Sequence, residues 1–212
     1  MNQPISFRIR ATYSKTGNLR FIGHLDLQRL WERAFRRANL PMQFSQGFSP
    51  KVRLNLASAL PLGITSHVEL IDFWLVELLP LQTIHAALKN ALPAELQVTA
   101  LESVPLDLPS LQSSIQASEF KITLPDTINP ADLQSAVETF LAASEFLRNR
   151  RGKTYNLRPL VHAMSLEDTP GGIFLCITVS AREGATGRPD EVLDQLGLDP
   201  LACAIERTRL VF

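Results

Sequence analysis

The chain has 212 residues, 45% of them hydrophobic and 20% charged, with equal numbers of basic and acidic residues. This composition is ordinary for a folded protein and excludes extensive disorder, and a chain of this length can bury a stable core without disulfides or metal. No CxxC pair is present, which excludes a thiolate zinc or iron–sulfur site, and no apolar run reaches the roughly 18 residues of a membrane span. We therefore expect a cytoplasmic protein with two inert, buried thiols.

Periodicity predicts a first set of elements within residues 1–105. Residues 5–13 alternate as a strand, and residues 24–39 carry an apolar stripe at helical spacing that Pro41 ends. The next predicted elements are strands at 51–58 and 67–77, a helix at 81–92 and a strand at 96–104. This order, β-α-β-β-α-β, describes one ferredoxin-like unit.

The Pro- and Ser-rich segment 104–114 predicts a linker, after which the order repeats. The later predictions are a strand at 119–125, a helix at 130–144, strands at 160–168 and 173–180, a helix at 189–197 that Gly197 caps, and a strand at 203–212. The predicted fold is α+β, with two tandem ferredoxin-like (βαββαβ) units of antiparallel sheet at 1–105 and 115–212.

The charges are distributed unevenly along the chain. Residues 1–53 contain ten Lys or Arg and two acids, whereas residues 54–145 contain two bases and eleven acids. Residues 146–158 hold five further cations and no acid. Such asymmetry predicts a surface that faces a polyanion, backed by an acidic one.

The first candidate site is the helix at 24–39, whose arginines lie off its apolar stripe: Arg29, Arg33, Arg36 and Arg37. Rows of guanidinium groups can clamp phosphates with two hydrogen bonds each. The alternative is an ordinary solvated face. Such a face is normally balanced by acids, and only Asp26 and Glu32 are available here, which favours an anionic ligand.

The second candidate is the loop at 44–51 with the strand that follows it, and its candidate residues are Ser45, Gly47, Phe48, Ser49, Lys51 and Arg53. Gly47 permits a positive φ that turns amide groups toward an anion, and Phe48 could stack on a base. The spacing is not that of a P-loop. For Phe44 and Phe48 we favour the alternative that both rings fill the core, and we expect Lys51 and Arg53 to be exposed.

The third candidate is a basic and aromatic stretch that contains Arg148, Arg150, Arg151, Lys153 and Tyr155. This mixture suits single-stranded RNA, and the alternative is an exposed mobile loop.

His24 lies near Tyr13, Lys15, Asp26 and Ser45 and could support metal-independent RNA cleavage, although a capping or core role is favoured. The other histidines show no ligand spacing, so no metal is expected.

Three segments carry a resemblance to a known family: LRFIGHLDLQRLWERAFRRANLPMQFSQGFSPKVRLNLASALPLGITSHVE at 19–69, TYNLRPLV at 154–161 and GRPDEVLDQLG at 187–197. They resemble the bacterial radical SAM-linked protein family. In that family the helix usually opens with Ser-His-Leu-Asp, whereas this chain has Gly23 before His24. The resemblance implies a domain fused to, or encoded beside, a radical S-adenosylmethionine enzyme that often also binds cobalamin. It also implies neighbouring ribonuclease and ribosome-related genes.

The chain itself lacks the CxxxCxxC of a radical enzyme, so we expect the accessory part, with no cofactor of its own. The leading hypothesis is a non-catalytic domain that binds RNA or a ribosome-associated nucleoprotein and cooperates with the radical enzyme. One alternative is a module that docks the radical enzyme without RNA. Another is a metal-independent endoribonuclease centred on His24.

Overall fold

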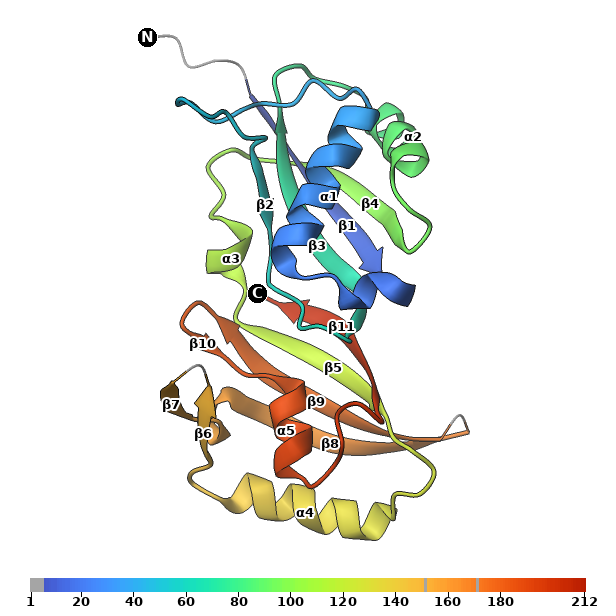
Figure 1. Cartoon of the computed structure of the whole chain (residues 1–212), viewed down its shortest axis with the longest axis vertical. Coiled ribbons are helices and arrows are strands. Elements are labelled where there is room, and N and C mark those ends of the chain that lie inside the picture. Colours follow the sequence, from blue (N-terminus) through green and yellow to red (C-terminus); the bar gives the residue numbers. More distant parts are fainter. Residues whose placement is uncertain (1–5, 151, 171) are drawn as a thin grey trace. The chain divides into compact units, whose positions relative to one another are not determined.

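The protein is described by a computed structural model that covers residues 6–150, 152–170 and 172–212 (Figure 1). The chain is α+β and divides into two compact units, Met1–Ser114 and Ile115–Phe212. Paired strands in each unit are antiparallel. Arg151, a member of the third candidate site, lies outside the described residues.

The first unit contains, in chain order, β1 (Phe7–Lys15), a 3-10 helix (Gly17–Phe21), α1 (His24–Arg37), β2 (Leu54–Leu56), β3 (Thr65–Leu75), α2 (Leu81–Ala91), β4 (Leu96–Val104) and α3 (Leu111–Ser114). Its sheet has the order β2-β3-β1-β4. The register places Arg8 opposite Trp74 and Arg10 opposite Asp72. Asn39, in the left-handed region at φ 51°, follows α1 and ends it.

Helices α1 and α2 cover one face of this sheet (Figure 1). Tyr13 of β1 meets Trp31 of α1 edge to face, with ring centroids 5.1 Å apart. One turn further, Phe35 packs on Phe73 of β3 at 4.8 Å. These buried rings orient α1, because the opposite side of the helix must then face away from the sheet.

Residues 105–114, interpreted from the sequence as a linker, pack on the other face of the first sheet. The guanidinium of Arg8 donates to the carbonyl oxygens of Leu108 at 2.6 Å and Pro109 at 2.8 Å. Leu111 of α3 is fully buried. This segment packs as part of the first unit, because a buried arginine needs acceptors and a buried leucine needs a core, and the segment meets both needs.

The second unit contains, in chain order, β5 (Ala117–Thr123), α4 (Pro130–Ala142), β6 (Leu147–Arg150), β7 (Lys153–Asn156), a 3-10 helix (Arg158–Leu160), β8 (Val161–Thr169), β9 (Gly172–Arg182), β10 (Ala185–Thr186), α5 (Pro189–Gln195) and β11 (Ala204–Val211). In its sheet, β9 pairs with β8, β10 and β5, and β5 pairs with β11. Strands β6 and β7 form a separate hairpin that the hydrophobic pattern did not predict. Gly197, at φ 76°, follows α5 as expected.

Candidate functional site

The outer surface of α1 carries a cluster of exposed cations. Its members are Arg29, Arg33, Arg36 and Arg37, and we call them the arginine face. The opposite side of the helix buries Leu27, Trp31, Ala34 and Phe35 in the core. Because this buried stripe holds the helix in one orientation, the arginines are presented to solvent together, as their spacing predicts.

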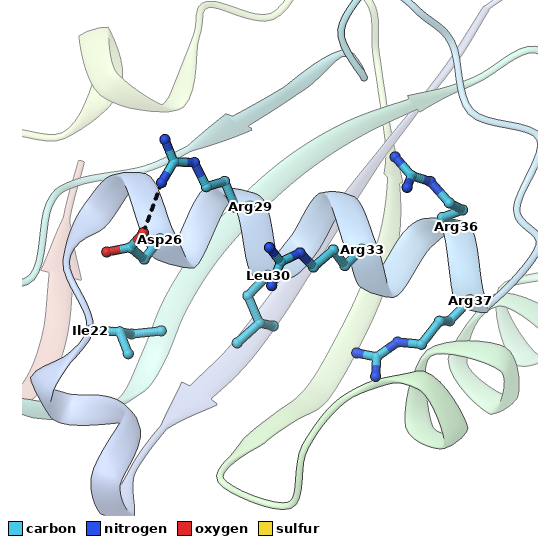
Figure 2. Close-up of a pocket in the computed structure, with 7 residues that line it drawn as sticks. All are labelled: Ile22, Asp26, Arg29, Leu30, Arg33, Arg36 and Arg37. Atoms are coloured by element: carbon cyan, nitrogen blue, oxygen red, sulfur yellow. Dashed lines mark hydrogen bonds and ion pairs between the residues drawn. The ribbon is translucent and has the colours of Figure 1, made fainter.

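The arginine face lines a shallow groove of about 570 Å³, whose other walls are Ile22, Asp26 and Leu30 (Figure 2). Figure 2 shows Arg29 reaching back to Asp26, while Arg36 and Arg37 leave the helix in different directions. The groove thus combines four guanidinium groups with two apolar side chains, Ile22 and Leu30. Such a surface can hold several anionic groups of one ligand.

Carboxylates balance only a small part of this charge. Arg29 pairs with Asp26 at 3.1 Å, and both side chains are largely exposed, so the pair is weak. Glu32 accepts a hydrogen bond from Gln28 at 3.1 Å. Within the residues that the structure describes, Arg33, Arg36 and Arg37 form no ion pair. Three guanidinium groups are thus available to a ligand.

The predicted loop at 44–51 forms the tip of a small hairpin. The amide of Ser45 donates to the carbonyl of Lys51 at 2.8 Å, and the amide of Lys51 donates to the Ser45 hydroxyl at 3.0 Å. Gly47 has a φ of 137°, which agrees with the positive value expected there. Ser49 is exposed at this tip, as is Lys51.

The interpretation of Phe44 and Phe48 as core residues is wrong. Phe48 is fully exposed and Phe44 is half-exposed. The hairpin precedes β2, and residues 45–51 form its tip beyond the bridge between Phe44 and Val52. An exposed phenylalanine at a tip next to lysine remains a candidate for stacking on a base.

Arg53 does not belong to the arginine face, although it is exposed as expected. It precedes β2 and lies over the ring of Trp74, with its central guanidinium carbon 4.4 Å from the ring centroid. Trp74 follows Phe73 along β3, so its side chain points away from α1. The first unit therefore presents cations on both faces of its sheet.

Sequence reasoning missed the ionic cluster beneath this tryptophan. Arg8 and Arg10 of β1 both bind Asp72 of β3, with shortest separations of 2.5 and 2.8 Å. Asp72 is completely buried and Arg8 nearly so. The alternation of β1 indicates that Arg8 and Arg10 share one face of the strand. It does not indicate their partner, because the acid that neutralises them lies about sixty residues later.

In the second unit, β6 and β7 carry the basic stretch, and their cations are balanced by α5. Arg148 forms an ion pair with Asp194, and Arg150 approaches Glu191 at 3.9 Å. The register sets Tyr155 opposite Arg148, with Lys153 opposite Arg150. Burial raises the pKa of Glu191, an effect that Arg150 and Arg148 partly oppose. This stretch therefore has fewer free charges than its own sequence indicates.

His24 is the first residue of α1 and is half-buried. Burial lowers the pKa of its imidazole below the ordinary 6.5, Glu69 opposes this effect and Lys15 adds to it. The expected proximity to Lys15 is therefore present. Ser45 instead follows the opposite end of α1 and does not join this group. Across the described residues, no group of three or more His, Cys, Asp or Glu could hold a metal ion.

Known proteins identify the family but not an activity. The family described as "Uncharacterized protein conserved in bacteria (DUF2344)" matches residues 8–189. The chain belongs to this family. The match carries no link to radical S-adenosylmethionine enzymes, and no curated protein matches the chain. In the described part of this DUF2344 chain, no helix is long and apolar enough to cross a membrane.

Two solved structures contain chains that align with this one. One, "Crystal Structure of a Cbf5-Nop10-Gar1 Complex", has a chain that aligns with a TM-score of 0.51 at 10% identity, covering 95% of this chain and 48% of that one. The other, "Crystal structure of the archaeal box H/ACA sRNP Nop10-Cbf5 complex", gives 0.45 at 8% identity, with coverage of 95% and 47%. The DUF2344 chain thus spans about half the length of the chains it matches. The first similarity supports the fold alone.

Proposed function

We propose that this DUF2344 protein is a non-catalytic RNA- or ribonucleoprotein-binding domain that contacts phosphates through the arginine face of α1. One observation carries the proposal: three exposed arginines without a carboxylate partner, in the described part of the chain, line a single groove together with Arg29. Arginine forks match phosphate geometry, and a row at i, i+4 repeats about every 6 Å along a helix.

The proposal includes a fold for each of the two units. We infer that both units are ferredoxin-like domains, close to the limits 1–105 and 115–212 with residues 105–114 added to the first. The first unit supports this inference with the element order β-α-β-β-α-β and the sheet order β2-β3-β1-β4. The second unit supports it with the sheet order β8-β9-β5-β11, to which β6, β7 and β10 are additions. In the second unit, we propose Lys153 and Tyr155 as auxiliary contacts, because Arg148 and Arg150 are occupied by acids.

The partner enzyme is a separate part of the proposal. The resemblance to the radical SAM-linked family is its only support, and it implies a radical S-adenosylmethionine enzyme, with or without cobalamin. The arginine face could instead dock an acidic surface of that enzyme, with no RNA involved. Co-purification of the two proteins after nuclease treatment, combined with no RNA binding by the isolated chain, would favour this alternative.

The decisive experiment measures the affinity of the chain for a fluorescent single-stranded RNA as a function of salt. The logarithm of the affinity should fall linearly with the logarithm of salt concentration, by about 0.7 per phosphate contacted. The Arg33→Glu/Arg37→Glu double variant should bind more weakly, and its slope should be smaller by about 1.4.

The matched control is Arg182→Glu, a charge reversal at an exposed arginine of the second unit. It changes the net charge of the molecule but not the arginine face, so its affinity should stay close to that of the wild type. The control reverses one charge and the double variant two, so a loss of binding free energy in the control that is half that of the double variant would mean that only net charge matters. Wild-type binding that does not depend on salt would refute the proposal.

A further inference from the structure

The face of the first sheet that is turned away from α1 carries a second groove, of about 470 Å³. Six residues that line it define what we call the tryptophan groove: Arg53, Asn55, Trp74, Leu106, Leu108 and Gln112. It shares no residue with the groove of the arginine face. The two grooves are therefore separate candidate binding sites.

Arg53 lines this groove and is held by two contacts. Its central guanidinium carbon lies over the Trp74 ring, 4.4 Å from the centroid, and its Nη1 donates to Oε1 of Gln43 at 3.1 Å. The same Gln43 oxygen accepts a hydrogen bond from the Ser6 hydroxyl at 2.8 Å. Because the residue is nevertheless exposed, the outer face of the guanidinium plane is open and already oriented.

Arg8 builds the opposite wall of the groove and is not available to a ligand. Its Nε and one Nη2 hydrogen bond go to Asp72, and its other donors hold the carbonyls of Leu108 and Pro109. These bonds fix the segment that carries Leu106 and Leu108, whose side chains are exposed. The groove thus combines a fixed cationic plane with two apolar side chains.

We propose that the tryptophan groove takes one unpaired nucleobase of the bound RNA, stacked on the outer face of Arg53. A flat base fits a guanidinium plane and apolar walls, and unstacked bases are commonly bound in this way. Asn55 and Gln112 can donate to and accept from the edge of the base. This inference rests on the proposed RNA-binding function and deepens it, because an unpaired base requires that the bound RNA be single-stranded at this point.

The chemistry of Arg53 favours a base over an acidic peptide. A carboxylate would need the hydrogen-bonding edge of the guanidinium, and Gln43 already occupies part of that edge. Stacking needs only the plane, which is open. A lysine at position 53 would keep the charge but remove the plane, so Arg53→Lys separates the two kinds of ligand.

The test compares two probes of equal length and charge: a single-stranded RNA that contains one 2-aminopurine, and an abasic ribose-phosphate strand. Arg53→Lys should bind the base-containing RNA roughly 5-fold or more weakly than the wild type and the abasic strand equally well. The 2-aminopurine emission should be quenched by the wild type and not by the variant. Thermal melting of both proteins verifies the fold.

The arms of the test separate this inference from the proposed function. Arg33→Glu/Arg37→Glu should weaken both probes alike, since it removes phosphate contacts. If Arg53→Lys binds both probes like the wild type while the double variant loses both, the stacking site is refuted and the arginine face stands. If Arg53→Lys loses binding to the base-containing RNA while the double variant binds both probes like the wild type, the arginine face is refuted and the stacking site stands. Selective loss of binding to an acidic peptide in Arg53→Lys would assign the groove to peptides and also refute the stacking site.

Discussion

The carboxylate of Asp72 accepts two hydrogen bonds from Arg8, from Nε at 2.9 Å and from Nη2 at 2.5 Å. Both residues are buried between the first sheet and the segment 105–110. Arg10, on the same strand, donates two more hydrogen bonds to this carboxylate, at 2.8 and 3.1 Å. Part of the positive charge in residues 1–53 is therefore structural and does not reach the surface.

Replacement of Asp72 by asparagine should strongly destabilise the first unit. The change leaves Arg8 buried without a counter-charge, which costs about 3–5 kcal/mol of unfolding free energy. Chemical denaturation followed by circular dichroism measures the loss. Asp107→Asn, at an exposed position in the adjoining segment, is the control and should be neutral. A loss below about 1 kcal/mol would show that the pair contributes little.

Truncation to alanine should reduce stability at Phe35 but not at Phe48. Phe35→Ala removes a fully buried ring that contacts Trp31 and Phe73, and should cost about 3–5 kcal/mol. Phe48→Ala removes a fully exposed ring and should leave thermal stability unchanged. Reduced stability of Phe48→Ala would mean that this ring packs somewhere after all. The same variant tests base stacking at the hairpin tip if RNA affinity is measured.

His24 should titrate below the ordinary histidine pKa of 6.5, since burial favours its neutral form. The unfolded chain then binds a proton at His24 more readily than the folded chain does. The stability that neutral His24 contributes is therefore complete above pH 6.5 and is lost as the pH falls from 6.5 toward the folded pKa. NMR titration of the His24 imidazole measures this pKa. His24→Gln should flatten the pH dependence of stability. Any RNA cleavage that disappears in His24→Ala would revive the endoribonuclease alternative.

The contact between the β6–β7 hairpin and α5 should be electrostatic and easily loosened. Asp194→Asn frees Arg148 and should increase amide hydrogen exchange in the hairpin, while the global stability falls by about 0.2–1 kcal/mol. If Arg148 can contact RNA once released, the variant should also bind RNA more tightly than the wild type. Unchanged exchange would mean that other contacts hold the hairpin.

Cys176 should be a slow nucleophile. Burial, together with the neighbouring Glu167, raises the pKa of its thiol to about 11. At pH 8 about one thiol in a thousand is then ionised, and only the thiolate reacts. Titration with a disulfide reagent should therefore proceed much more slowly in native Cys203→Ser protein than in the same protein in denaturant. Equal rates would contradict the expected protection.

Local sequence patterns were sufficient to predict most helices and strands and the exposure of the arginine face. Alternation in β1 and the 3.6-residue stripe of α1 report which side of each element is apolar, and this property depends only on neighbouring residues. The four arginines of α1 are exposed for the same reason. Gly47 and Gly197 also follow local rules, since a positive φ is a property of one residue.

Only the tertiary structure decided which charges are free. Asp72 neutralises arginines about sixty residues earlier in the chain, and Asp194 neutralises Arg148 from α5. A count along the sequence cannot detect such pairs, because ion pairing depends on distance in space. The same limit explains Arg53, which is close to the arginine face in sequence but lies over Trp74 on the opposite face of the sheet.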